Sequence, residues 1–240
     1  MKPTISPDTS LDPGSLHPDR DRDAASNTAI YRKIKADCTA FLATQTRGQL
    51  GMVITGIALL YSPNDIQQMK RNFGYKIQNI TPEYRNRLEE KVAEHLLGTW
   101  QTIQLLQQQG TLATMTEPVP PLAHDYWKMV AEQCAPRDAG DDIRLRFLKF
   151  LLAGFSMFVQ KVPAHAVGTP FPGGDSVELI DGVYYCPVRE KANDVDAALC
   201  PFCPALQTPA IGYLKPPTNP SEHRKQEFIR SLHDFHNFNW

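Results

Sequence analysis

The segment from Ile143 to Val162 constrains the fold more than any other part of the chain. Its apolar residues recur on every side of the helix that their spacing predicts, so the helix has almost no polar face. The most apolar windows of the chain, Phe147–Val159 and Leu50–Tyr61, are both well short of the roughly 20 residues that a membrane-spanning helix needs. We therefore predict that this segment is the central, most buried helix of a helical domain and that the chain does not insert into a membrane.

Helical spacing of apolar residues predicts further helices on the N-terminal side of this segment. The clearest of them begins at Thr81-Pro82 and ends at Gly110. Ser62-Pro63 is typical of a helix start, because Ser62 can cap the first turn and proline fits into it. The expected fold class is mainly α, a single helical domain of about six helices. The predicted helices cover residues 27–45, 49–61, 62–74, 81–110, 125–134 and 143–162.

After Pro163 the sequence pattern changes from helical spacing to short β-forming runs and turn residues. Ser176–Ile180 and Val183–Cys186 flank Asp181-Gly182, and an Asp-Gly pair between two β-forming runs predicts a small β-hairpin. A cysteine metal knuckle is expected to follow it. The expected organisation is a disordered segment over 1–26, a helical domain over 27–206 with a cysteine-rich subregion at 164–206, and a proline-rich tail over 207–240 with a short helix at 222–235.

The overall charge gives no sign of a nucleic-acid-binding surface. The formal net charge is -1, whereas proteins that bind the phosphate backbone normally carry a basic excess. The first 26 residues lack the apolar core of a secretory signal, so we expect a cytoplasmic protein. Composition identifies no partner, and a protein partner stays open.

Three of the five cysteines lie within eighteen residues near the C-terminus, as Cys186-x13-Cys200-x2-Cys203. Two cysteines separated by two residues can direct both sulfurs at one ion through a tight turn, and a third at the end of a hairpin strand can join them. Thiolates suit zinc and iron–sulfur clusters because both favour soft sulfur donors. In a chain without an export signal, this pattern favours metal binding over a disulfide framework.

Most structural zinc sites have four protein ligands, and the cluster supplies three. His165 is the first candidate for the fourth, because it lies in the loop between the buried helix and the hairpin. The sequence therefore predicts a structural zinc site of the Cys3His type, formed by Cys186, Cys200, Cys203 and His165. The reserve ligands are Cys134, His124, His233, His236 and Asp194.

The same cysteines allow two other hypotheses. They could hold an iron–sulfur cluster with one open iron or act as redox thiols in an enzyme, with Arg189 or Lys191 near the substrate. Alternatively, the chain is a helical scaffold that binds a partner, and its cysteines are simply buried, as Cys38 is expected to be. Motifs of hydrolases, zinc proteases and dinucleotide-binding enzymes are missing, so the sequence leaves open whether the chain is an enzyme.

Three stretches resemble an uncharacterised family of methanogenic archaea, known only as a domain of unknown function. They are His165–Gly174, Gly182–Val188 and Ala198–Cys203, and the similarity extends over about residues 29–207. Where the family has a proline after the histidine, Ala166 stands in this chain. The resemblance implies an archaeal cytoplasmic protein in which His165 and the three cysteines are the positions of interest. It implies no activity, and an anaerobic host favours an iron–sulfur cluster.

Overall fold

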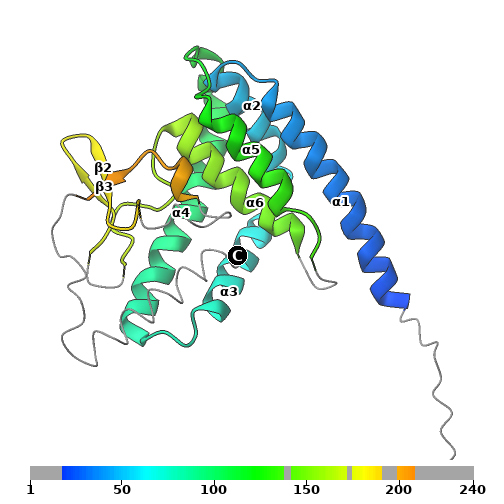
Figure 1. Cartoon of the computed structure of the whole chain (residues 1–240), viewed down its shortest axis with the longest axis horizontal. Helices are drawn as coiled ribbons and strands as arrows, with labels where there is room; N and C mark the ends of the chain where they lie inside the picture. The colour runs from blue at the N-terminus through cyan, green and yellow to red at the C-terminus, as the bar shows by residue number, and fades with distance from the viewer. Residues whose placement is uncertain (1–17, 138–141, 172–174, 191–198, 209–240) are drawn as a thin grey trace, which may run out of the picture.

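The computed structural model describes residues 18–137, 142–171, 175–190 and 199–208, with side chains from residue 26 onward. These ranges are mainly helical, as predicted, and a small sheet lies at one side of the helices (Figure 1). The α-helices are α1 (Pro18–Leu42), α2 (Arg47–Ala58), α3 (Pro63–Lys76), α4 (Pro82–Gln109), α5 (Leu122–Gln133) and α6 (Ile143–Gly154). The shorter helices are η1 (Thr111–Thr114), η2 (Phe155–Gln160) and η3 (Cys200–Phe202), and the strands are β1 (Glu178–Ile180), β2 (Val183–Cys186) and β3 (Leu206–Gln207).

Two local signals set helix ends as the sequence predicted. At the start of α3, Ser62 Oγ accepts from the Asp65 amide at 3.4 Å, and Asp65 Oδ2 accepts from the Ser62 amide at 2.7 Å. This reciprocal pair is a capping box, which satisfies two amides that the helix itself leaves without acceptors. At the end of α4, Gly110 has a φ of 65°, which glycine adopts without a clash because it lacks a Cβ.

The first helix is longer than its apolar pattern predicts. α1 begins at Pro18, inside the segment 1–26 that we expected to be disordered, and not near Asn27. The expectation rested on apolar periodicity, which begins only at Ile30. A helix can start earlier with polar turns, and proline is favoured at its first position. Residues 1–17 and 209–240, including the short helix expected at 222–235, lie outside the described residues.

The central position of α6 is confirmed. Every residue of α6 except Arg144 is buried, and the helix contacts α1, α2, α4 and α5. Tyr126 of α5 donates a hydrogen bond of 2.7 Å to the Phe150 carbonyl. A Cβ added at Gly154 would lie 2.7 Å from the Trp127 ring, so glycine is what lets α5 pack this closely against α6.

The predicted continuous helix over 143–162 changes its geometry at Phe155. From there η2 is a π-helix, and it ends at Lys161, which has a φ of 61°. In η2, Ser156 Oγ lies 3.3 Å from Thr99 Oγ1 of α4, so two buried hydroxyl groups share a hydrogen bond. Within the described ranges, no helix combines the length and the apolar character that crossing a bilayer requires.

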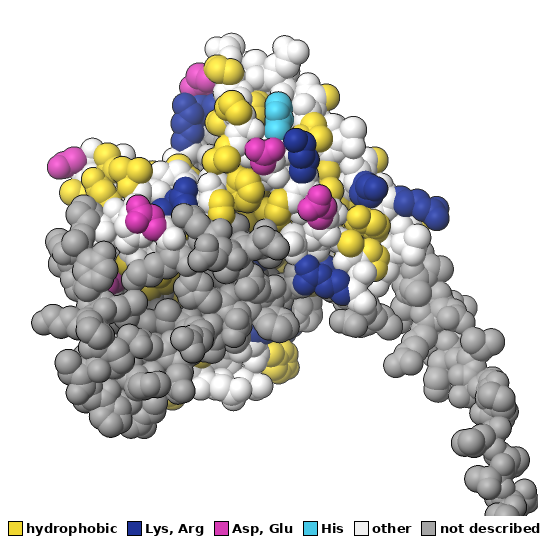
Figure 2. Space-filling model, in the orientation of Figure 1, with side chains coloured by type: hydrophobic (Ala, Val, Ile, Leu, Met, Phe, Trp, Pro, Cys, Tyr) yellow, Lys and Arg dark blue, Asp and Glu magenta, His cyan; other side chains and the backbone are white. Residues whose placement is uncertain are grey.

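The β-hairpin forms around the predicted turn. β1 and β2 are antiparallel, and Asp181 and Gly182 both have positive φ, 49° and 80°, as a type I′ turn requires. The sequence did not predict β3, which pairs parallel to β2 with Cys186 opposite Gln207. Figure 2 shows apolar side chains at this end of the molecule. The exposed ones of the sheet are Leu179, Ile180, Val183 and Leu206.

Two cationic residues of α6, Arg146 and Lys149, are buried in the core but have different surroundings. Arg146 is 2% exposed and donates to the carbonyls of Gln133 at 2.9 Å and Ala135 at 3.3 Å, where α5 ends. Lys149 is 8% exposed. Burial, followed by the positive charge of Lys76, lowers the pKa of Lys149 to about 7. Holding a lysine in this environment opposes folding at neutral pH, because the charged form is poorly solvated there.

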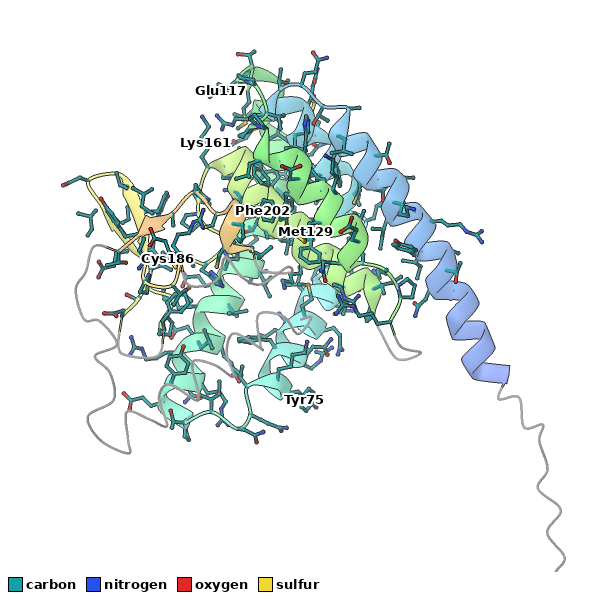
Figure 3. The ribbon with its side chains drawn as sticks, viewed as in Figure 1. Tyr75, Glu117, Met129, Lys161, Cys186 and Phe202 are labelled. Atoms are coloured by element: carbon teal, nitrogen blue, oxygen red, sulfur yellow. The ribbon has the colours of Figure 1, made fainter. Side chains whose placement is uncertain are left out.

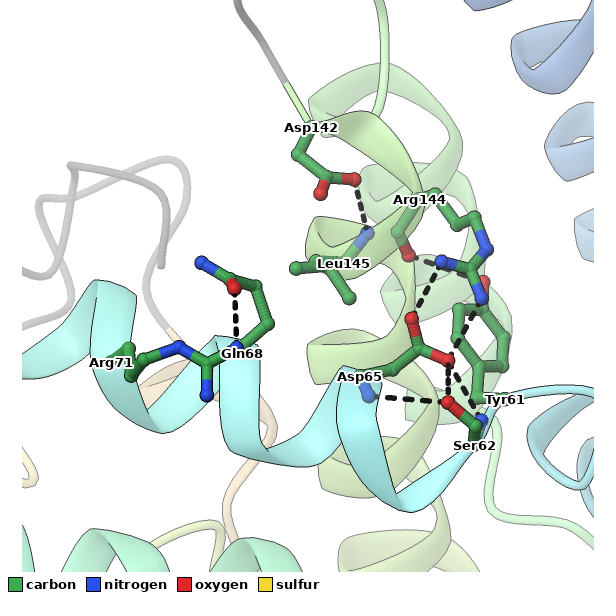
Figure 4. Close-up of polar contacts among 8 residues, drawn as sticks. All are labelled: Tyr61, Ser62, Asp65, Gln68, Arg71, Asp142, Arg144 and Leu145. Carbon is green, nitrogen blue, oxygen red and sulfur yellow. Dashed lines mark hydrogen bonds and ion pairs between the residues drawn. The ribbon is translucent and has the colours of Figure 1, made fainter.

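Arg144, the exposed residue of α6, joins this helix to α3 (Figure 4). Its guanidinium donates to both carboxylate oxygens of Asp65, at 2.7 and 2.9 Å, and lies 4.8 Å from the centre of the Tyr61 ring. The hydrogen bonds from Arg144 hold the pKa of Asp65 at about 2. Asp65 is also the capping-box residue of α3, so one carboxylate both caps that helix and docks it on α6.

We expect Arg144→Gln to lower the free energy of unfolding by about 1 kcal/mol at pH 7, because a bidentate surface pair is lost. Asp65 has a folded pKa below its ordinary value of 3.8. The contribution is therefore present above pH 4 and lost as the pH falls toward 2. Urea unfolding of both proteins at several pH values measures it. Lys33→Gln, which removes an exposed pair with Asp37, is the control, and an equal loss in both variants would contradict the assignment.

We expect Lys149→Met to stabilise the fold at pH 7 and to lose this advantage as the pH rises. The folded pKa of Lys149 lies below its ordinary value of 10.5, so between pH 7 and 9 the unfolded chain binds the extra proton. The free energy of unfolding of the wild type should then rise relative to the variant by roughly 2 kcal/mol over this interval. Urea unfolding at pH 7, 8 and 9 checks this, and a pH-independent difference would contradict it.

Candidate cysteine site

The three cysteines of the candidate site come from two segments that the small sheet brings together. Cys186 ends β2, Cys200 begins η3, and Cys203 follows η3 directly. The chain then enters β3 beside β2, and the amide of Thr208 donates to the Cys186 carbonyl at 3.2 Å. We call Cys186, Cys200 and Cys203 the cysteine cluster.

The three thiols are buried close enough to influence one another's ionisation. Burial raises the pKa of Cys186 to about 11 and that of Cys200 to about 12, and it also raises the pKa of Cys203. The charge of Cys203 raises the pKa of Cys186 further, and the charges of Cys186 and Cys203 both raise that of Cys200. The thiols are therefore protonated at neutral pH, which makes them poor nucleophiles.

Arg189 and Gln207 hold the backbone around the cluster. Arg189 Nε donates to the Ala205 carbonyl at 3.1 Å, and its Nη2 donates to the Pro201 carbonyl at 3.3 Å. Gln207 donates to the Pro187 carbonyl at 3.0 Å and accepts from the Glu190 amide at 3.0 Å. The Arg189 guanidinium also lowers the pKa of all three thiols, opposing burial. Arg189 therefore acts on the cluster through backbone contacts and charge, and sequence analysis missed Gln207 because only β3 places it there.

Aromatic contacts attach this region to the helical core. The Phe202 ring lies 5.2 Å from the Tyr126 ring of α5 in an edge-to-face arrangement, and Figure 3 shows Phe202 of η3 over α5. Tyr84 of α4 donates a hydrogen bond of 2.9 Å to the Pro170 carbonyl. The helices thus fix the loop after Pro163 and η3 independently of the sheet.

His165, the candidate fourth ligand, lies beside the same region. Its ring is 5.8 Å from the ring of Phe171, edge to face. Phe171 belongs to a small apolar cluster with Cys186 and Ala205, against which Cys203 packs. His165 and Cys200 also line a common pocket. The four predicted ligands therefore share one neighbourhood at the C-terminal end of α6.

The described residues do not form a ready-made metal site. Among them, no group of three or more His, Cys, Asp or Glu side chains is arranged so that it could hold an ion. The metal knuckle thus stays a prediction. Cys134 is buried at the end of α5, where its charge acts on Cys38, and His124 is exposed. The other reserve ligands, Asp194, His233 and His236, and also Lys191, lie outside the described residues.

Comparison with known proteins gives relatives in methanogenic archaea. A UPF0305 protein of Methanothermobacter thermautotrophicus is 45% identical over 69 residues, which cover 29% of this chain and 44% of the relative. One from Methanopyrus kandleri is 32% identical over 88 residues, covering 37% and 62%. One from Methanocaldococcus jannaschii is 23% identical over 143 residues, covering 60% and 85%.

The first two matches thus span about half of the relatives' own lengths. No solved structure matches the chain. The model of an archaeal family described as "Uncharacterized protein conserved in archaea (DUF2115)" matches residues 46–208, which include α2 to α6, the sheet and the cysteine cluster. The chain therefore belongs to this uncharacterised archaeal family, as its resemblance implied.

Proposed function

We propose that the chain binds a structural zinc ion through Cys186, Cys200 and Cys203, with His165 as the fourth ligand. The observation that carries the proposal is the cysteine cluster itself: two buried thiols and a half-buried one, from two chain segments, each of which affects or is affected by the ionisation of another. Zinc prefers such soft donors, and Cys3His is one of its common structural ligand sets.

The local geometry supports this donor set but requires side-chain rotation. Zinc–sulfur bonds are about 2.3 Å long, so the sulfurs would have to turn toward a common centre. Arg189 and Gln207 brace the backbone of both segments. Cys203 follows a single 3₁₀ turn that begins at Cys200, and such a turn presents two residues to one ion.

The short secondary-structure elements of this region favour a structural role for a bound ion. β3 has two residues, β1 three and β2 four, and η3 is one short turn. Elements of this size bury little apolar surface, and a bound metal commonly supplies the missing folding energy. The raised pKa values of the thiols fit the same role, because an inert thiol becomes a ligand only when a metal displaces its proton.

The iron–sulfur and redox alternatives use the same residues. An iron–sulfur cluster on three thiolates would leave one iron open, which would make the site catalytic. A redox thiol needs a lowered pKa to react at neutral pH, and burial shifts the three thiols in the opposite direction. This favours a bound metal over free thiol chemistry. If no metal binds, the hypothesis of a partner-binding scaffold remains.

We expect the anaerobically purified chain to contain about one zinc per molecule. Cys200→Ala and Cys203→Ala should each lose most of it, because a site that has lost one of its three thiolates holds zinc weakly. Cys134→Ala changes an equally buried cysteine of the core and should keep the metal. Elemental analysis of the three variants and the wild type measures the content, and the visible spectrum separates zinc, which is colourless, from an iron–sulfur cluster.

The proposal would be contradicted if the purified chain contained no metal and took up no zinc under reducing conditions. Equal metal content in Cys200→Ala and Cys134→Ala would contradict the ligand assignment. Chelation provides a second measurement, since it should increase proteolysis within 164–208 while α1 to α6 keep their helical circular dichroism signal.

A further inference from the structure

A pocket lies where the segment of Cys200 meets the helices. It lies between α4, α6 and the loop after Pro163, and Leu199 and Cys200 close it on the side of η3. About 40 Å³ of it is open to the centre of a water molecule. Since a single water needs about 10–15 Å³ of such space, the pocket has room for a ligand group of a few heavy atoms.

The polar side chains of the pocket are cations, histidines and hydroxyls. Lys149 enters it from α6, Lys91 and His95 come from α4, and His165 and Thr169 come from the loop. Of the described residues that line it, none is an aspartate or a glutamate. The chain as a whole has a net charge of -1, so this concentration of basic groups is local.

Lys149 provides the buried positive charge. It is 8% exposed, whereas the Lys91 side chain is 30% exposed and already forms an ion pair with Glu94 at 2.7 Å. Burial lowers the pKa of Lys149 most, the charges of Lys76 and Arg146 lower it further, and the charge of Cys134 raises it. An anion entering the pocket would be attracted by the Lys149 ammonium, which lines it.

The walls increase the strength of that attraction. Val92 and Leu96 of α4 face Leu152 and Ala153 of α6 across the pocket, and all four are buried. Coulomb interactions between apolar walls are stronger than in water because the effective dielectric constant is lower. Burial also lowers the pKa of His95 to about 4. His95 is therefore neutral at physiological pH and retains one N–H donor.

The loop is held in place as a wall of this pocket. Gly168 has a φ of 83°, and a Cβ there would lie 3.2 Å from Lys91 Cε, so glycine lets the Lys91 stem lie against the loop. Thr169 Oγ1 donates to the Ala166 carbonyl at 2.7 Å, and the Gly168 amide donates to the Val177 carbonyl at 2.8 Å. The opening is thus shaped before any ligand arrives, which lowers the entropic cost of binding.

We infer that this pocket binds a small oxyanion, a carboxylate or phosphate group, with Lys149 as its charge partner and the histidine N–H groups as further donors. Charge-assisted hydrogen bonds from an ammonium to such oxygens are short and strong. The site explains why α6 keeps a lysine where an apolar residue would pack at lower cost. Its lysines lie on α4 and α6 and are not zinc ligands, whereas His165 and Cys200 line the pocket and are also proposed ligands of the zinc.

The test is calorimetric titration of the full chain, with the metal content it has as purified, with phosphate, sulfate and acetate at constant ionic strength in a chloride background. At least one oxyanion should bind saturably, and the ranking of acetate against phosphate identifies the carboxylate or phosphate source. Lys149→Met should weaken this binding by roughly tenfold or more, because the buried charge is lost. Lys128→Met removes an exposed lysine of α5 and should leave the affinity unchanged.

Two results would overturn the inference. They are no saturable binding of any of the three anions, and equal affinities in Lys149→Met and the wild type. Retained binding in Cys203→Ala would support a pocket that is separate from the cysteine cluster, whatever the metal content of that variant.

Discussion

The complete burial of α6 organises the rest of the structure. A helix whose only exposed residue is Arg144 has to be covered on every side, and α1, α2, α4 and α5 provide that cover. The close approach of α5 depends on Gly154, which leaves room for the Trp127 ring. Burying this helix also buries the charge of Lys149, and the pocket arises where α4 and α6 leave space around it. Core packing and the proposed anion site are therefore properties of one helix.

The C-terminal region depends on that core for its position but not for its internal geometry. Phe202 against Tyr126 and Tyr84 on the Pro170 carbonyl attach it to α5 and α4. Within it, Arg189 and Gln207 hold the strands and η3 by backbone hydrogen bonds. Among the described residues, its apolar cluster contains four buried ones, too few to replace a cross-link. A metal ion at the cysteines would supply the interaction that so small a core lacks.

Local signals in the sequence predicted the elements that depend on neighbouring residues. The capping residue Ser62, the glycine at Gly110 and the Asp181-Gly182 turn each act within a few positions, so sequence alone predicts them. β3 has two residues and is defined only by its partner, and the pocket combines side chains as far apart as 91 and 200. Neither has a local pattern. A lysine at position 149 in a mainly apolar helix was a visible signal, and its role can be inferred only from the residues that surround it in the fold.

The two proposed sites meet at Cys200 and His165, which are proposed zinc ligands and also line the pocket. Zinc with three thiolates and a neutral imidazole would have a net charge of about −1. This centre would repel an oxyanion held by Lys149, and the thiolates alone would repel it more strongly. Zinc and the anion would therefore oppose each other's binding, by the same factor in both directions, since coupling between two bound ligands is reciprocal. The protonated thiols of the metal-free chain remove that repulsion, so the occupancy of one site would set the affinity of the other through charge alone.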